Sequence, residues 1–251
     1  MALVKTEAII LKYSNYRETS KIITFFTREF GKIKCIAKGV RDTKSRWGGV
    51  LQSIAHLNII FYYNENRTLH LISGAEYAQP MKKLYDCNEK IEIGYKIVEL
   101  TNRTTVENHQ HTKLFDLLSE TLKKLEDATN NYSNMLFNFE FQLANALGFA
   151  IDVETLAGDN ELSGYNNLHY NFKPFNNNYH LNSNGVVNDE NLMLNYDNIG
   201  ILKAFHRGNF DEIMRLNIVK PNDIILEKFF ERHFDQHLEE KGFSKTKKVI
   251  G

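Results

Sequence analysis

Cysteine and proline are scarce in this sequence, which holds two cysteines and three prolines in 251 residues. Cys35 and Cys87 are far apart, so we expect two small buried side chains rather than a disulfide or a cysteine zinc site, which needs more thiolates. No stretch approaches the ~20 apolar residues of a membrane span. The first residues also lack the basic and then apolar pattern of a secretory signal. These absences predict a cytoplasmic protein that crosses no membrane.

An excess of either charge is also absent, because 31 basic residues balance 31 acidic ones. The balance is uneven along the chain. Residues 1–80 hold twelve lysines and arginines against six acids, a net charge of +6, so the remaining residues carry −6. A basic part beside an acidic part favours a polyanionic partner for the basic part, although many domains show as much asymmetry by chance.

Motifs for catalysis are missing as well. The chain has no P-loop, no nucleophile elbow and no paired-carboxylate motif, so we expect a protein that is not an enzyme. His233 and His237 are four residues apart on a predicted helix and could face one metal ion, but no third ligand is evident. Packing of these histidines beside Phe229 and Phe230 is the favoured interpretation.

The first 76 residues have the pattern of short strands. The runs of β-branched and aromatic or of alternating residues lie at 8–11, 22–26, 32–38, 57–63 and 69–71. In the third run the lysines alternate with Ile33, Cys35 and Ala37, which places them on the opposite face of the strand. Five strands with one long polar loop at 39–52 predict a small barrel, and an OB-fold is the natural candidate.

From about residue 79 the apolar period becomes helical. Stripes at 114–125 and 135–147 predict helices, the second with Gly148 as its C-cap, and helical patterns return at 196–216 and 222–241. Residues 152–195 are rich in Asn, Gly and Tyr and have no sustained period, so we expect an irregular insert with some short strands. The predicted fold class is α+β, with an OB-fold domain at 1–79 and a mainly α-helical domain at 80–251.

The strongest indication of function lies in residues 31–50, which hold six basic residues and one acid. Long basic side chains at strand spacing, with glycines that permit close approach, suit a phosphate backbone. Trp47 in this segment could stack on a base, with Tyr13 and Tyr16 nearby, or it could plug the barrel end. The predicted DNA contacts are Lys32, Lys34, Lys38, Arg41, Lys44 and Arg46, with Arg17 and Lys21 in second rank and Trp47 as the stacking residue.

The lysine-rich strand has a second interpretation. Lysines often form the solvated side of an edge strand, where they prevent aggregation. Composition alone does not separate this from DNA binding. A rival function of another class is a protein-interaction scaffold, in which the OB-like domain docks a partner protein without touching DNA.

Several ordered motifs resemble one known family. The N-terminal motifs are TEAIIL at 6–11, YRETS at 16–20, FTREFGKI at 26–33, AKGVR at 37–41 and KSRWGGVLQ at 44–52. Together they closely resemble the start of the RecO family of bacterial recombination mediators. The resemblance is strong over residues 6–55 and weaker, though consistent in order and length, through the helical remainder.

The resemblance implies a DNA repair and recombination protein with an N-terminal OB-fold and a helical C-terminal domain. It implies binding to single- and double-stranded DNA, annealing of complementary strands, and partnership with RecR in loading RecA onto DNA coated by single-strand-binding protein. It also implies that the acidic tail of single-strand-binding protein docks on the helical domain. Candidate cations for that tail are Lys113, Lys123, Lys124, Lys203 and Arg207, each of which could equally be solvated helix-face charge.

The chain departs from the family in one respect. Many members carry a four-cysteine zinc site in the insert after the central helix, whereas residues 149–195 contain no cysteine here. We therefore expect no zinc and no other cofactor.

Overall fold

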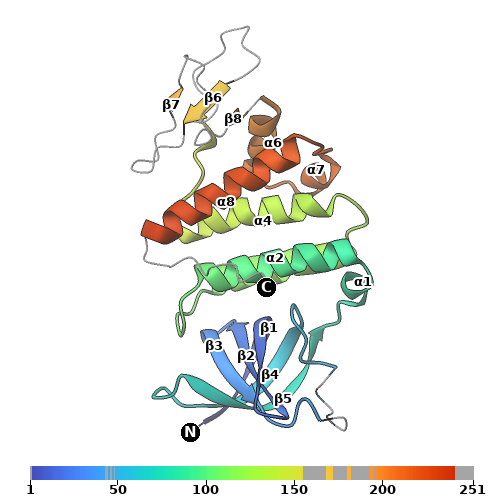
Figure 1. The fold of residues 1–251 in the computed structure, drawn as a ribbon, viewed down its shortest axis with the longest axis vertical. Helices are drawn as coiled ribbons and strands as arrows, with labels where there is room; N and C mark the ends of the chain where they lie inside the picture. The colour runs from blue at the N-terminus through green and yellow to red at the C-terminus, as the bar shows by residue number, and fades with distance from the viewer. Residues whose placement is uncertain are drawn as a thin grey trace. The chain divides into compact units, whose positions relative to one another are not determined.

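Residues 2–79 of the computed structural model contain five strands (Figure 1). The structure describes residues 2–42, 45, 47, 49–154, 168–171, 180–181, 193–194 and 196–240. The strands are β1 (Ala2–Tyr16), β2 (Ser20–Thr27), β3 (Gly31–Ala37), β4 (His56–Tyr63) and β5 (Leu69–Gln79). They close into a barrel in the order β1-β2-β3-β5-β4, with β4 paired back to β1. Only β3 and β5 run parallel. This order is that of a five-stranded OB-type barrel, as predicted.

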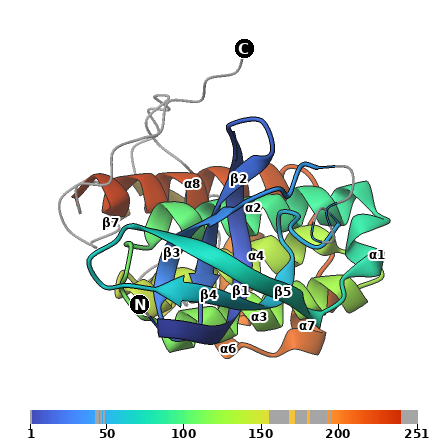
Figure 2. The same cartoon turned by 90° about the horizontal axis from the view of Figure 1, so that it is seen from below.

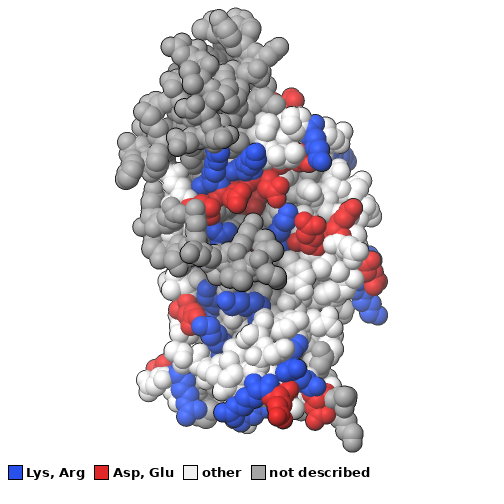
Figure 3. All heavy atoms as spheres, in the orientation of Figure 1, with Lys and Arg blue, Asp and Glu red and all other residues white. Residues whose placement is uncertain are grey.

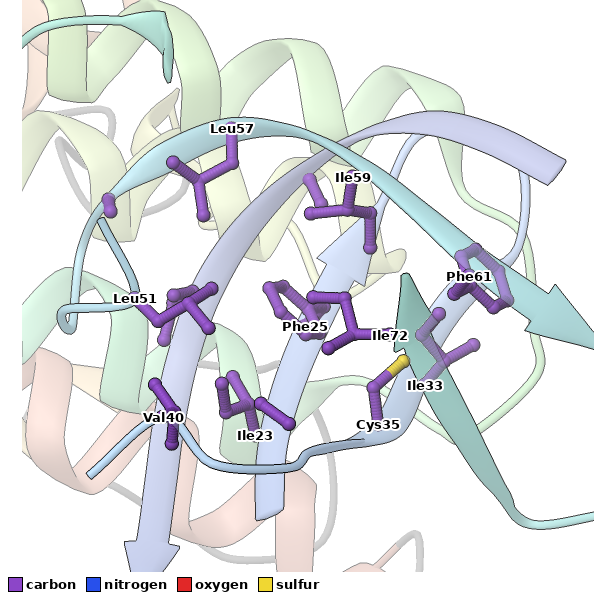
Figure 4. Packing of buried hydrophobic residues seen from close by; sticks show 14 residues of the cluster. Ile23, Phe25, Ile33, Cys35, Val40, Leu51, Leu57, Ile59, Phe61 and Ile72 are labelled. Carbon is purple, nitrogen blue, oxygen red and sulfur yellow. The ribbon is translucent and has the colours of Figure 1, made fainter. Parts of the chain in front are cut away.

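The interior of the barrel is filled by alternate side chains of its strands (Figure 4). β3 shows the reason most simply, because its burial alternates residue by residue. Ile33, Cys35 and Ala37 are buried in the interior cluster, while Lys32 and Lys34 on the other face are half-buried. Apolar side chains removed from water on this scale supply the main stabilisation of the barrel. The alternation predicted for this strand is confirmed.

Three helices lie with the barrel in one compact unit, residues 1–132. They are α1 (Lys82–Tyr85), α2 (Asn88–Thr104) and α3 (Thr112–Asp127). Ile9 and Phe26 are fully buried although they do not belong to the interior cluster of the barrel. Phe26 contacts Phe115 of α3 with ring centroids 6.1 Å apart. The helices therefore cover an apolar outer surface of the strands, on one side of the barrel (Figure 2).

The second compact unit, from residue 133, is mainly helical. Its elements are α4 (Tyr132–Leu147), α6 (Tyr196–Arg207), α7 (Phe210–Arg215), α8 (Asn222–Glu240) and the short strands β6 (Leu168–Asn171), β7 (His180–Leu181) and β8 (Met193–Leu194). Its core is rich in phenylalanine, with Phe139, Phe205 and Phe230 completely buried. Gly148 ends α4 with a φ of +83°, the left-handed conformation expected of a C-cap glycine.

The expected helices and the short strands of the insert are thus present. Contacts within the chain separate it after residue 132, because α1, α2 and α3 pack with the barrel, whereas the prediction divided it after residue 79. That division remains a prediction about independent folding. In the part of the chain that the structure describes, no helix is both long and apolar enough to cross a membrane.

Candidate nucleic-acid interface

Four cations lie in neighbouring backbone segments at one end of the barrel, where the β1–β2 hairpin meets the turn after β3. The Arg41 amide donates to Thr19 O at 2.9 Å, and Arg41 Nη1 donates to Arg17 O at 3.3 Å. Lys21 is the register partner of Ala37, the residue before Lys38. We call this set the barrel-end cations: Arg17, Lys21, Lys38 and Arg41. All four were predicted as DNA contacts.

The barrel-end cations differ from other cations of the barrel in their ion pairing. Within the described ranges none of the four takes part in an ion pair. Arg17 lies over the Tyr16 ring instead, 5.3 Å from its centroid. Burial, and then the nearby positive charge of Arg41, lower the pKa of Lys21. An anion bound here would relieve the repulsion between Lys21 and Arg41.

Two other cations of the barrel are already compensated by acids. Lys5 Nζ lies 3.1 Å from Glu76 Oε1. Arg28 bridges two carboxylates, with Nε 2.8 Å from Glu7 Oε2 and Nη1 2.5 Å from Asp116 Oδ1. Such pairs reduce the field that a distant phosphate would experience. Figure 3 shows Lys and Arg side chains interspersed with Asp and Glu on this face of the molecule. The cations of the barrel therefore differ in what they offer a polyanion.

Lys32 and Lys34 of β3 were predicted to bind phosphate, and both are engaged within the protein. Lys32 Nζ donates to Asn102 O at 2.8 Å and to Thr105 O at 2.5 Å, which are carbonyls at the C-terminal end of α2. Burial is the main cause that lowers the pKa of Lys32. Lys34 forms an ion pair with Glu107. Both lysines lie on the expected strand face, but that face meets the α2–α3 connection.

Two described residues of the segment after the barrel-end cations, Trp47 and Gly49, contact the barrel. Trp47 is half-buried and packs against the interior cluster. This agrees with the second of its two expected roles, in which it plugs the end of the barrel. The Tyr77 hydroxyl donates to Gly49 O at 2.7 Å. Lys44 and Arg46, which were also predicted to contact DNA, lie outside the described residues.

An aromatic side chain at the same end was left out of the predicted contacts. Tyr13 is 43% exposed, and Lys21 Nζ lies 3.9 Å from the centroid of its ring. Strand register explains the pairing, because Tyr13 lies opposite Ile23, two residues from Lys21 on the same face of β2. The antiparallel β1–β2 pattern in the sequence could have revealed this neighbour.

The two histidines of α8 pack against phenylalanine rings, His233 in the core and His237 half-buried. His233 is 1% exposed, and its Nε2 donates to Phe149 O at 2.9 Å. Its ring stacks on Phe229, and the His237 ring stacks on Phe149 with centroids 4.7 Å apart. Burial lowers the pKa of His233 to about 4. The favoured interpretation of packing beside phenylalanine is confirmed for these residues. No group of three potential metal ligands occurs among residues that the structure describes.

The strand order and the uncompensated cations together define the class of the protein, an OB-fold barrel with a cationic end that is followed by helices. Comparison with family models makes this class more specific. Residues 1–81 match the model described as "Recombination protein O N terminal", and residues 89–246 match "Recombination protein O C terminal". The chain belongs to the recombination protein O family, RecO, as its N-terminal motifs predicted.

Similar curated proteins carry the same family name. The DNA repair protein RecO of Salinibacter ruber is 36% identical over 166 residues, which cover 64% of this chain and 64% of that protein. The DNA repair protein RecO of Chloroherpeton thalassium is 35% identical over 150 residues, covering 60% of this chain and 58% of that protein. The matched part of the chain thus spans a little under two thirds of the length of these relatives.

Proposed function

We propose that this protein is a DNA repair and homologous recombination mediator that binds single- and double-stranded DNA and anneals complementary strands. In this proposal it acts with RecR to load RecA onto DNA coated by single-strand-binding protein, and it catalyses no covalent reaction. Membership of the recombination protein O family and the names of its relatives support the role. The proposed location is the bacterial cytoplasm, at the nucleoid.

One observation carries the proposal of DNA binding. The barrel-end cations lie on the β1–β2 hairpin and the turn after β3, and OB-fold barrels bind oligonucleotides with their β2–β3 face and β1–β2 loop. Uncompensated cations attract the phosphate backbone and release its counterions on binding. Lys44 and Arg46 follow directly in the sequence and remain predicted contacts.

Annealing follows from the same electrostatics. Two complementary strands repel each other through their phosphates, and a cationic surface that neutralises part of both backbones lowers that repulsion. No hydrolysis is needed, which agrees with the lack of a catalytic motif in the sequence. Six phosphate contacts, from the barrel-end cations with Lys44 and Arg46, would give a slope of about −4 for log affinity against log salt on a single strand.

The test compares compensated with uncompensated cations. The double variant Lys38→Ala/Arg41→Ala removes two phosphate contacts, so the salt slope on an oligonucleotide should become shallower by about 1.4. Lys5→Ala is the matched control, since Lys5 is paired with Glu76, and it should leave the slope unchanged. Binding of an unlabelled oligonucleotide, measured by calorimetry at several salt concentrations, gives both values.

A wild-type protein with no measurable affinity for DNA would overturn the proposal and favour the scaffold alternative. A strand-annealing assay, with and without single-strand-binding protein on the strands, then tests the mediator role.

The docking of the tail of single-strand-binding protein on the helical unit is a further part of the proposal. Of the candidate cations, Arg207 is exposed and ion-paired with Glu212 at 3.2 Å.

The absence of zinc also remains a proposal. Elemental analysis of the purified protein measures it directly. One zinc per chain would contradict it and would require ligands other than four cysteines, because the sequence has only two.

A further inference from the structure

Tyr13 and Lys21 form a pair that the fold does not require. The Tyr13 ring is 43% exposed on β1, and its contact with Lys21 is a cation resting on a ring face at 3.9 Å. No hydrogen bond of the Tyr13 hydroxyl accompanies it within the described residues. A large aromatic ring exposed among uncompensated cations is the arrangement that single-strand binding proteins use for stacking on bases.

We propose that Tyr13, Lys21 and Arg41 form a subsite for one nucleotide of single-stranded DNA. The base stacks on the Tyr13 ring, and the Lys21 ammonium leaves the ring face to bind the adjoining phosphate beside Arg41. This inference rests on the proposed function and adds to it the element that distinguishes single from double strands.

The exchange at the ring face is favourable for two reasons. A cation–π contact at an exposed site is weak, whereas a base stacked on an aromatic ring is held more strongly and excludes water from both faces. Lys21 also lies near the positive charge of Arg41, and a phosphate between them converts repulsion into attraction. The long lysine stem lets the ammonium move while the strand stays in place.

Other aromatic residues at this end fit the role less well. Trp47, the residue that the sequence suggests first, packs against the interior of the barrel. Tyr16 is half-buried, whereas Tyr13 is 43% exposed. Each ring has a cation near one face, so greater exposure is what distinguishes Tyr13.

The subsite predicts a difference between single and double strands. In a duplex the bases are stacked on one another and hidden from a protein ring, so only the phosphates reach Lys21 and Arg41. Tyr13→Leu should therefore weaken binding to a single-stranded oligonucleotide by about 5- to 100-fold. Its affinity for duplex DNA, and the slope of log affinity against log salt on the single strand, should change little.

Two variants of the full chain serve as controls. Tyr13→Phe keeps the ring and should bind single strands within about 2-fold of the wild type. Tyr95→Leu removes an equally exposed tyrosine from α2 and should also bind as the wild type does. Thermal unfolding of each variant shows that the fold is intact, which is expected because both side chains are exposed.

A cross-linking measurement gives a readout that a structural role would not change. A single-stranded oligonucleotide carrying 5-iodouracil should photo-cross-link to Tyr13, as identified by mass spectrometry of the wild-type protein. Equal loss of single- and double-strand affinity in Tyr13→Leu, or no loss in either, would overturn the subsite while wild-type DNA binding stood. Failure of the wild type to bind any DNA would instead overturn the proposed function itself.

Discussion

His233 is neutral in the folded protein because its ring is enclosed by phenylalanines. The ring is 1% exposed, stacks on Phe229 and donates its Nε2 proton to Phe149 O. A charged imidazolium there would lose its hydration, so burial lowers the pKa of His233 to about 4. The unfolded chain has an ordinary histidine pKa near 6.5. Between about pH 6.5 and pH 4, this histidine is therefore protonated in the unfolded chain and neutral in the folded one.

A pH dependence of stability follows from His233. The folded pKa lies below the unfolded one, so the stabilisation is complete above about pH 6.5 and is lost as the pH falls toward 4. Between pH 7 and pH 5 the wild type should lose about 2 kcal/mol through this group. His233→Gln keeps a donor for Phe149 O and should lack that part of the loss. Urea unfolding at both pH values measures the difference.

The control for that experiment is an exposed histidine. His206 in α6 is exposed, and His206→Gln makes the same substitution outside the core. If His233→Gln loses stability between pH 7 and pH 5 as steeply as the wild type, another group is responsible for the acid sensitivity.

At the scale of elements, β3 supports the helices as well as the barrel. Lys32 reaches from the strand to two carbonyls at the end of α2, where the helix leaves its last C=O groups without partners. A cation at this end also interacts favourably with the helix dipole. Asn108 N donates to Lys32 O at 2.9 Å, so the backbone of the α2–α3 connection follows the same strand.

The prediction at this scale concerns Lys32→Met. Loss of two charge-assisted hydrogen bonds should destabilise the first unit by about 2 kcal/mol, as measured by urea unfolding. DNA affinity should fall much less than in Lys38→Ala/Arg41→Ala. Lys34→Met is the matched variant, because the ion pair of Lys34 with Glu107 is more exposed and should contribute less than about 1 kcal/mol. Equal losses of DNA affinity in Lys32→Met and in the double variant would show that Lys32 binds phosphate after all.

β3 also shows which structural features could be predicted from the sequence and which could not. The alternation of β3 was predictable because the period of a strand fixes which side chains share a face. What meets that face was not predictable, since Glu107 lies 73 residues beyond Lys34 and reaches it only through the path of the α2–α3 connection. Trp47 is a similar case. The sequence left two roles open for it, stacking on a base or plugging the barrel end, and the contacts that half-bury it come from the closed barrel.

At the scale of the whole molecule, the barrel and the first three helices form one unit of contacts. Ile9 and Phe26 are neighbours in register on the barrel, and both are fully buried outside its interior cluster. Phe26 contacts Phe115, and Arg28 bonds to Asp116 on the same helix. Exposing two such side chains costs about 1.5–3 kcal/mol each. The barrel should therefore depend on α3 for its stability.

Two fragments test that dependence. Residues 1–132 should give a folded monomer, whereas residues 1–81, which match the N-terminal family model, should be destabilised and self-associate. Light scattering and circular dichroism distinguish these states. Phe26→Ser in the shorter fragment should reduce its association. A monomeric 1–81 fragment as stable as 1–132 would refute the prediction and would support independent folding of residues 1–79.

The contact between Phe26 and Phe115 also has a consequence for how the chain is made. A ribosome finishes the last barrel strand at Gln79 well before it reaches Phe115. At synthesis rates of about 5–20 residues per second, the interval is roughly 2–7 s. During that time Ile9 and Phe26 of the nascent barrel have no α3 to cover them. Synthesis of this protein thus includes a brief interval in which an apolar patch of the barrel is exposed before α3 is made.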